Sequence, residues 1–373
     1  MSAESEALSI IKYSVFDAGT PQITDWDAAL AVLSEHAILP MVKTPEGISW
    51  INASRYNNLK KFILHGAAVN ELNTLFATPV IFKGFAAAQY YPHPADRTMG
   101  DIDFMPMGED FDEAVEIMKK NGFIRTDKAI KGYEYLRHMS FEKNGVCYEM
   151  HRYFSFNEDA NDKRLDQIIK EAVPVKRQAD SCSFYALPDA ENGLVLLEHI
   201  EHHIKTGVGL RQIIDWACYV EKFLTDDVWE HKFAALTRET GLEKLAIFTT
   251  ALTEKYLGTT HRRFSEAAEE TTVDLFMEEI LDAGNFGERR DFVAGKIASY
   301  REESNIFKKL QRSGMYNWKY AWTHNWVRPF AWIYQIIRIV GILLKKRSFN
   351  NANDIYQRHD RLFRELEICK YRK

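Results

Sequence analysis

The sequence predicts an α+β fold in which a small mixed sheet is flanked by N-terminal and C-terminal helical regions. Apolar residues recur with helical spacing over residues 1–76 and again beyond residue 189. Between these regions the pattern changes to short apolar runs, alternating runs and turn residues, which is typical of strands. The chain has 373 residues, of which 46% are hydrophobic and 27% charged, a globular composition long enough for two or three packed units.

Two helical patterns make up the N-terminal region. Trp26, Leu30 and Leu33 follow the spacing i, i+4, i+7, and Asp25 stands where a helix cap is expected. A second apolar pattern runs over residues 59–76. Both patterns predict helices that bury one face.

The central region, residues 77–188, carries the strand signals. The run PVIF at 79–82 is short and apolar, and DIDFM at 101–105 alternates between polar and apolar residues. The segments YEYLRHMSFE and VCYEMHRYF are two alternating runs on either side of Asn144-Gly145. An Asn-Gly pair between such runs predicts a tight β-hairpin.

Helical spacing returns in residues 189–300, with the clearest apolar stripe at Leu210, Ile213 and Ala217. The sequence shows neither an internal repeat nor a long flexible linker. We therefore expect this helical region to close over the sheet, followed by a basic, aromatic-rich helical tail at 301–373.

Charge is distributed unevenly along the chain. Residues 1–300 have a formal net charge of −15 and residues 301–373 one of +10. An acidic body argues against sequence-independent nucleic-acid binding over its surface, because that mode of binding needs a basic face, which only the tail could supply. The apolar stretch 330–344 of the tail is too short to span a bilayer.

Two predictions compete for this stretch. The preferred one is that it packs as a helix against the helical arms of the body. The alternative is peripheral membrane contact, with Lys345, Lys346 and Arg347 on anionic headgroups. The amino terminus lacks the pattern of a secretory signal, and the four cysteines are widely spaced, so a cytoplasmic location is expected.

The residues that carry chemistry are carboxylates on predicted strands. Asp101 and Asp103 are two residues apart and so point to one face, and Glu149 is a third carboxylate if its strand lies beside theirs. Adjacent carboxylates repel each other, and a hard divalent cation such as Mg²⁺ relieves that repulsion. The alternative is that the Asp-x-Asp pair lies on a solvated edge strand.

A phosphate-binding feature precedes this pair. Lys83-Gly84 ends one strand and opens a helix, a position where a lysine, free backbone N–H groups and the helix dipole can hold phosphates. A phosphate cradle next to metal-binding carboxylates predicts a nucleoside triphosphate site.

The segments KGFAAAQYYPHPADRTMGDIDF, YEMHRYF, GVGLRQIIDWA and GNFG resemble the bacterial nucleotidyltransferase family proteins of the DNA polymerase β-type superfamily. The resemblance covers most of the chain. In that superfamily the fingerprint is a Gly-Ser turn, a D-x-D pair and a later acidic residue on a strand. Asp101, Asp103 and Glu149 match the last two features, whereas Phe85 follows Gly84 in place of the serine.

The resemblance implies a nucleotidyltransferase core at 77–188 and transfer of a nucleoside monophosphate from an NTP to an acceptor, with release of pyrophosphate. The acceptor can be a protein, an RNA or a small molecule. Two Mg²⁺ (or Mn²⁺) ions would be held by Asp101, Asp103 and Glu149. The alternative is a catalytically silent scaffold of the same fold that binds a nucleotide or a protein partner.

The resemblance also implies roles for the basic side chains near the predicted site. Lys83, Gly84 and Arg97 would bind the triphosphate, and Arg211 would contact nucleotide or acceptor. Arg97 could equally be a surface residue of its loop, and Arg211 could form a surface i, i+4 pair with Asp215.

Three histidines, His199, His202 and His203, occupy one predicted helix. Neither a nearby carboxylate nor an HExxH motif supports a zinc site, so polar packing or lining of a cleft is the favoured interpretation. His151 shares a strand face with Glu149, where it would act beside a metal or, by default, as a hydrogen-bonded structural histidine.

Overall fold

The predicted α+β fold is confirmed by a mixed sheet with helices on both of its faces. The computed structural model describes residues 2–43, 49–126, 137–155, 159–179, 182–204, 206–285, 305–345 and 352–372. Residues 133–136 of the predicted hairpin, Phe286 and Gly287 of the GNFG segment, and Lys346 and Arg347 of the tail lie outside these ranges.

The sheet has seven strands in the order β3-β4-β5-β2-β1-β7-β6. The strands are β1 Pro79–Phe82, β2 Ile102–Pro106, β3 Ile124–Arg125, β4 His138–Lys143, β5 Val146–His151, β6 Val175–Ala179 and β7 Cys182–Ala186. β2 pairs antiparallel with β1 and parallel with β5, so it lies in the middle of the sheet. The alternative of a solvated edge strand for the Asp-x-Asp pair is therefore wrong.

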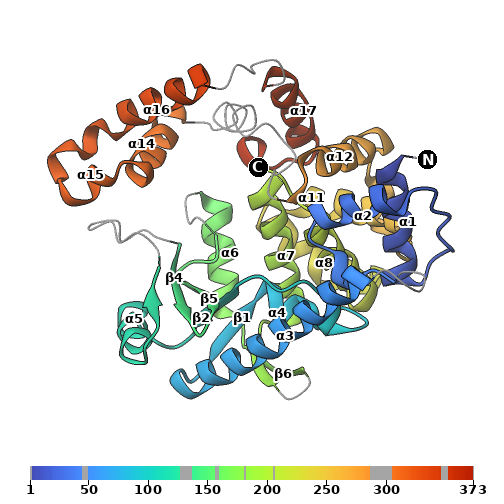
Figure 1. Cartoon of the computed structure of the whole chain (residues 1–373), viewed down its shortest axis with the longest axis horizontal. Coiled ribbons are helices and arrows are strands. Elements are labelled where there is room, and N and C mark those ends of the chain that lie inside the picture. The colour runs from blue at the N-terminus through green and yellow to red at the C-terminus, as the bar shows by residue number, and fades with distance from the viewer. Residues whose placement is uncertain are drawn as a thin grey trace.

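Helices precede, cover and follow the sheet, as Figure 1 shows. Up to the middle of the chain they are α1 Ala3–Phe16, α2 Trp26–Glu35, α3 Ser49–Leu75, α4 Lys83–Ala88, α5 Phe111–Lys120 and α6 Ala160–Glu171. Beyond it lie α7 Asp189–Ile204, α8 Leu210–Lys222, α9 Asp226–Val228, α10 Ala234–Glu239, α11 Glu243–Leu257, α12 Glu270–Ala283, α14 Ile306–Asn317, α15 Lys319–Thr323, α16 Ala331–Lys345 and α17 Ala352–Glu365. None of the described helices is both long and apolar enough to cross a membrane.

Local sequence signals account for several element boundaries. The side chain of Asp25 accepts a hydrogen bond from the backbone N–H of Ala28 and so caps α2, as the sequence predicts. The Asn144-Gly145 turn joins β4 to β5 with φ angles of 53° and 76°. These left-handed angles define the turn that an Asn-Gly pair favours, and they fix the register of the hairpin.

The two faces of the sheet belong to different cores. Ile102 and Phe104 of β2 join the core beneath α3 and α5, whereas Met105 joins the larger core formed with α7 and α8. Asp103 alternates with Ile102 and Phe104, so its side chain lies on the α7 and α8 side. The larger core also takes in residues of α1, α2 and α17, which join the two ends of the chain to the sheet.

The described helices of the tail pack in two separate places. Leu362 and Phe363 of α17 belong to the large core, whereas α14, α15 and α16 pack on one another around a small cluster of their own. Figure 1 shows these three helices beside the body. The preferred prediction that the apolar stretch packs against the helical arms is wrong, because Ile333, Ile336 and Val340 of α16 are exposed.

Burial of His65 in α3 creates a testable dependence of stability on pH. The side chain is 4% exposed, and its Nδ1 has no hydrogen-bond partner among the described residues. Burial, together with the charges of Lys61 and Arg97, lowers the pKa of His65 from 6.5 to about 4. The unfolded chain therefore binds one proton more than the folded chain between pH 6.5 and 4, and stability falls as the pH falls through that window.

His65→Leu is expected to remove this loss. The free energy of unfolding of the variant minus that of the unmodified protein should be about 2 kcal/mol larger at pH 5 than at pH 7.5. Urea titration at the two pH values measures this difference. His231→Leu is the control, since that side chain is 74% exposed. A gain that does not change with pH, or an equal gain in the control, would contradict the prediction.

Candidate functional site

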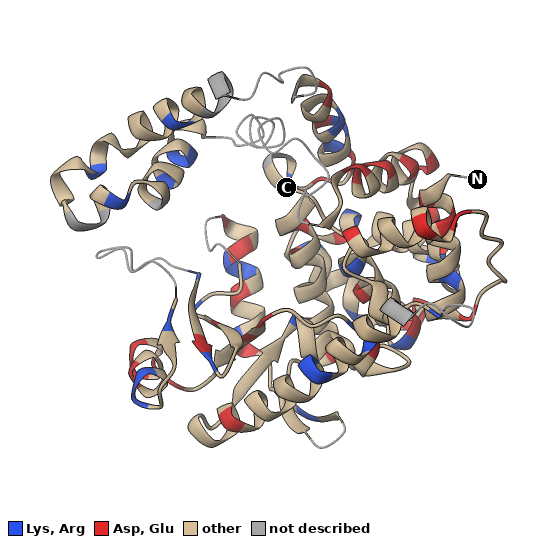
Figure 2. Ribbon diagram, in the orientation of Figure 1, with Lys and Arg blue, Asp and Glu red and all other residues tan. Residues whose placement is uncertain are grey.

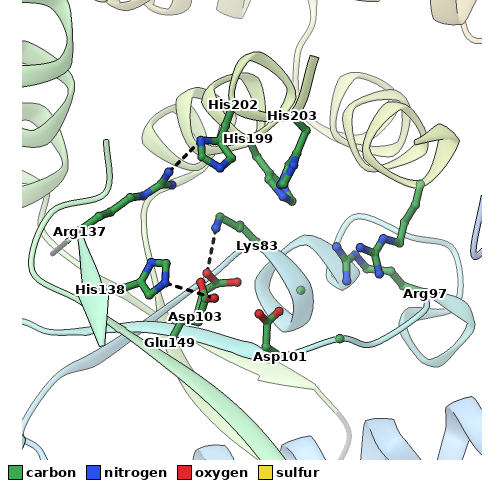
Figure 3. Close-up of a pocket in the computed structure, with 13 residues that line it drawn as sticks. Lys83, Arg97, Asp101, Asp103, Arg137, His138, Glu149, His199, His202 and His203 are labelled. Atoms are coloured by element: carbon green, nitrogen blue, oxygen red, sulfur yellow. Dashed lines mark hydrogen bonds and ion pairs between the residues drawn. The ribbon is translucent and has the colours of Figure 1, made fainter. Parts of the chain in front are cut away.

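One pocket collects all seven residues that the sequence analysis assigns to the site. The cavity has a volume of about 280 Å³ and lies between the sheet and α7 and α8. Figure 3 shows the carboxylates and Lys83 on one side and the imidazoles of α7 opposite them. Its lining consists of Lys83, Gly84, Arg97, Gly100, Asp101, Asp103, Arg137, His138, Glu149, His199, His202, His203 and Arg211.

The carboxylates sit together because of strand order and register. Asp103 of β2 lies directly beside Glu149 of β5 in the parallel pair, and Asp101 immediately precedes β2. Both Asp103 and Glu149 approach the same atom, His151 Nε2, at 2.9 and 3.8 Å. The predicted shared face of Glu149 and the aspartates therefore exists in the fold.

Lys83 stands at the junction of β1 and α4 in an unusual backbone conformation. Its φ is 45°, in the left-handed region that a lysine rarely adopts, and the next residue, Gly84, has non-helical angles. This turn brings Lys83 Nζ to 2.8 Å from Asp103 Oδ1, in an ion pair whose side chains are 10% and 5% exposed. α4 has only six residues and is kinked at Gly84, so the charge of Lys83 dominates any helix dipole there.

Two histidines add nitrogen ligands to the carboxylate cluster. A nitrogen of His138, a nitrogen of His151 and an oxygen of Glu149 lie within 4.8 Å of one another. His138 Nε2 is 3.4 Å from Glu149 Oε1. Among the described residues this is the group of three that can hold a metal ion, and the α7 histidines do not form one. The favoured sequence interpretation of those histidines, lining of a cleft, agrees with the pocket.

The ring of His151 faces an acceptor oxygen on each side. His151 Nδ1 lies 3.2 Å from the carbonyl oxygen of Tyr153, to which it can donate its proton. In that tautomer Nε2 carries a lone pair, yet it faces Asp103 Oδ1 at 2.9 Å. The other neutral tautomer donates from Nε2 to Asp103, whereas the first would place a second proton or a cation beside Nε2. A carbonyl-bound Nδ1–H with Nε2 turned to carboxylates is the usual arrangement of a metal-ligating histidine.

The pKa values show how strongly the carboxylates are coupled. Burial, followed by the charges of Asp103 and Asp101, raises the pKa of Glu149 to about 8. Burial and then Asp103 also raise the pKa of Asp101. Burial acts in the same direction on Asp103, but Lys83 and the hydrogen bond from His151 outweigh it and hold the pKa well below 3.8. Without a cation the cluster therefore carries less negative charge than three carboxylates would.

Arg97 is a buried structural partner as well as a pocket residue. Its Nε and Nη2 donate to both oxygens of Asp215 at 2.8 and 2.7 Å, and Tyr91 donates to the same carboxylate at 2.7 Å. Arg97 is 3% exposed, so the interpretation as a surface loop residue is wrong. Its bidentate fork, which the sequence analysis assigns to the triphosphate, is engaged by Asp215.

Arg211 lies on the pocket side of α8. The alternative of a surface pair between Arg211 and Asp215 is wrong, because Asp215 is 1% exposed and holds Arg97. Burial, with the charge of Arg97, lowers the pKa of the Arg211 guanidinium. Arg211 is therefore a cation at the pocket wall beside Asp101.

Arg137 and His138 are pocket residues that the sequence analysis does not identify. Arg137 Nη1 lies 3.2 Å from His202 Nδ1, and its Nη2 lies 3.3 Å from Glu198 Oε2 of α7. The alternation of the hairpin strand is a signal for His138, since the register sets it opposite His151. Arg137 has no such signal, because its partners are on a helix about sixty residues later.

The pocket thus sets clustered carboxylates opposite basic side chains and imidazoles, on a mixed sheet between helices. These are groups that can bind a cation and a polyanion. The model of a family described as uncharacterised nucleotidyltransferase matches residues 22–258. The chain belongs to this family, and the match includes the whole pocket. No curated protein and no solved structure matches the chain.

Proposed function

We propose that the protein transfers a nucleoside monophosphate from an NTP to an acceptor hydroxyl in a metal-dependent reaction. A bond forms between the acceptor oxygen and the α-phosphorus, the bond from that phosphorus to the bridging oxygen breaks, pyrophosphate leaves, and the acceptor proton passes to solvent. The family supports nucleotidyl transfer in general. The observation that carries the proposal is the meeting of Asp103 and Glu149 in register on adjoining strands, with Asp101 beside them.

The donor set fits a divalent cation. Asp103 receives Lys83 and His151 on one oxygen, Oδ1, among the described residues, which leaves Oδ2 for a cation. Asp101 and Glu149 have raised pKa values that a cation would lower. Asp101, Asp103 and Glu149 would hold Mg²⁺ or Mn²⁺, and the imidazoles of His138 and His151 favour Mn²⁺. When bound, the metal neutralises developing charge on the phosphates and lowers the pKa of the acceptor hydroxyl.

The cations of the pocket have separate tasks in this proposal. Lys83 can turn from Asp103 to the triphosphate, because its four-carbon stem is flexible and a cation on Oδ2 would weaken the attraction of the carboxylate for Lys83. Arg211 offers a second cation on the opposite wall. Arg97 contributes positive charge from its ion pair with Asp215 and orients α8.

The α7 wall suits the acceptor. Burial lowers the pKa of His203 to about 3 and holds that of His199 well below 6.5, so both imidazoles are neutral near pH 7. Neutral imidazoles donate and accept hydrogen bonds without competing for the metal-bound phosphates. With Arg137 they would orient an uncharged hydroxyl acceptor facing the carboxylates.

Transfer is tested by incubating the full chain with each α-labelled NTP, Mg²⁺ or Mn²⁺ and a cell extract. The expected result is label in a product together with released pyrophosphate, and loss of both on chelation of the metal. Heat-treated and protease-treated extracts then indicate whether the acceptor is a protein. Failure of every NTP and metal to give pyrophosphate would contradict the proposal.

Lys83→Ala is expected to weaken NTP binding by about 1.5 to 3 kcal/mol, because one charge-assisted contact to phosphate is lost. Mn²⁺ affinity should not fall, because Asp103 loses a competing cation. Calorimetric titration of NTP and of Mn²⁺ measures the two effects separately. Lys119→Ala is the control, since Lys119 is 44% exposed in a pair with Glu116. An unchanged NTP affinity in Lys83→Ala would remove Lys83 from phosphate binding.

The alternative of a silent scaffold has one observation in its favour. Phe85, which follows Gly84 in place of the expected serine, is 3% exposed and its ring lies 5.0 and 5.2 Å from those of Phe62 and Phe184. The position serves the core and offers no hydroxyl to a phosphate. NTP binding without pyrophosphate release under any metal would favour the scaffold.

A further inference from the structure

The three tail helices expose an unusual amount of apolar surface. We use the name tail arm for residues 305–345, which comprise α14, α15, the 3-10 turn Asn325–Phe330 and α16. Nine of the sixteen exposed large hydrophobic side chains of the described residues belong to it. The outer stripe is formed by Trp326, Phe330, Ile333, Ile336, Ile337 and Val340. A patch of this kind marks an interaction surface.

The interior of the tail arm is small and partly polar. Among the side chains of α16 that the structure describes, Ala331 and Gln335 are buried, and Gln335 lies 3.3 Å from the side-chain amide of Asn317. α14 crosses α16 so closely at Gly314 that an added Cβ would lie 1.9 Å from the carbonyl oxygen of Ala331. The buried cluster among the described residues of the tail arm is Met315, Ala321, Val327 and Ala331, whereas the exposed isoleucines of α16 lie outside it. Aliphatic residues outside a small interior reverse the usual distribution in water and are typical of helices in contact with lipid.

The charge of the tail arm identifies its partner. Residues 305–345 contain seven Lys and Arg and neither Asp nor Glu. Figure 2 shows basic residues and no acidic ones on these helices, whereas both signs occur over the body. Lys308, Arg312 and Lys319 are exposed. A wholly basic element with exposed Trp, Phe and Ile complements a surface that is both anionic and apolar.

The described length of α16 suits an orientation in the plane of the membrane surface. Its 15 described residues are about 22 Å long, and the hydrocarbon core of a bilayer is about 30 Å thick. A helix of this length with an apolar stripe lies in the plane of the interface.

We propose that the tail arm binds the surface of an anionic phospholipid bilayer, with the outer stripe of α16 inserted at the boundary between headgroups and acyl chains. The basic residues hold the phosphates of the headgroups, and Trp326, whose side chain is 70% exposed, enters the interfacial layer. This inference stands apart from the proposed nucleotidyl transfer, so Asp101→Asn should bind vesicles as the unmodified protein does.

The test is co-sedimentation of the full chain with vesicles of phosphatidylcholine alone or with about 30% phosphatidylglycerol. Binding to the anionic vesicles should be at least about tenfold stronger and should fall in about 0.5 M NaCl. Lipids brominated near the headgroup should quench tryptophan fluorescence, and Trp326→Phe should lose most of that quenching.

Two triple variants separate the tail arm from general surface hydrophobicity. The α16 variant is Ile333→Gln, Ile337→Gln and Val340→Gln, at side chains that are 39, 65 and 46% exposed. The control carries Gln at Leu59, Ile63 and Leu64 of α3, which are 43, 62 and 49% exposed. Gln keeps helix propensity high at all six positions. The α16 variant should lose at least about tenfold in vesicle binding at unchanged helical content, and the control should not.

Several results would overturn the proposal. These are equal binding to neutral and anionic vesicles, equal loss in the control variant, and absence of vesicle binding by the unmodified chain. A second copy of the chain is the competing occupant. Sedimentation velocity showing a dimer that the α16 variant dissociates, together with no vesicle binding, would assign the stripe to self-association.

Discussion

Asp101→Asn is expected to reduce nucleotidyl transfer by roughly 1,000-fold while leaving the free energy of unfolding unchanged or slightly higher. The loss corresponds to about 4 kcal/mol of transition-state stabilisation through the metal. Stability should not fall, because burial and Asp103 already raise the pKa of Asp101 and oppose its ionisation. Initial rates of pyrophosphate release and urea unfolding at pH 7.5 measure the two quantities.

Asp103→Ala should lose both activity and stability, which separates the two aspartates. Asp103 differs from Asp101 in the partners that hold its carboxylate. Lys83 and His151 both contact its Oδ1 in the buried site, and removal of one partner from a buried ion pair costs about 3 to 5 kcal/mol. Asp103→Asn should be less destabilised, since it keeps a hydrogen-bonding oxygen.

The exposed carboxylate of Asp112, with a side chain 78% exposed, is the matched control. Asp112→Asn should change neither rate nor stability by more than the small amount typical of surface pairs. Full transfer activity in Asp101→Asn would remove the pair from catalysis. Unaltered stability in Asp103→Ala would show that the Lys83 pair does not hold the site together.

The second large effect is expected at the Arg97–Asp215 pair, which should dominate stability. Arg97→Met should lose about 3 to 5 kcal/mol in the free energy of unfolding, because Asp215, at 1% exposure, would keep a buried uncompensated charge. A double variant with Met at 97 and Leu at 215 should lose less than the sum of the two single variants. Urea unfolding of the unmodified protein, the two single variants and the double variant completes this double-mutant cycle.

The control is an arginine–carboxylate pair at the surface that also has two hydrogen bonds, both to one oxygen. Arg164 donates to Glu239 through two nitrogens at 2.9 and 2.6 Å, but the side chains are 37 and 46% exposed. Arg164→Met should cost less than about 1 kcal/mol. Equal losses in the two Arg→Met variants would refute the role of burial. NTP binding by Arg97→Met should be measured without denaturant and only where the variant is folded. Weaker binding then reports on the pocket and not on unfolding.

The tail is an example of a sequence pattern that predicts a helix but does not predict which other helices pack against it. Apolar residues with helical spacing predict α16, and the helix forms from Ala331 to Lys345. Whether its stripe is covered depends on the packing of the whole chain. In the structure α14 covers Ala331 and Gln335, and Ile337 remains 65% exposed.

The sequence by itself determined the properties that follow from local dihedral angles. Side chains alternate along a strand, so Asp101 and Asp103 share a face, and Glu149 shares one with His151. The Asn144-Gly145 pair sets the hairpin and its register, because left-handed angles are accessible to these residues. These features depend on neighbours within a few residues of one another.

Only the tertiary structure decided which faces meet. Nothing in the strand patterns requires β2 to lie parallel to β5 rather than at an edge, and this pairing is what brings Glu149 beside Asp103. Asp215 reaches Arg97 across 118 residues, and the wall of α7 histidines comes from a helix that follows the sheet. Such contacts form because the whole core must be buried and because buried charges must be paired. Both requirements depend on residues far apart in the chain, so a local sequence pattern does not predict them.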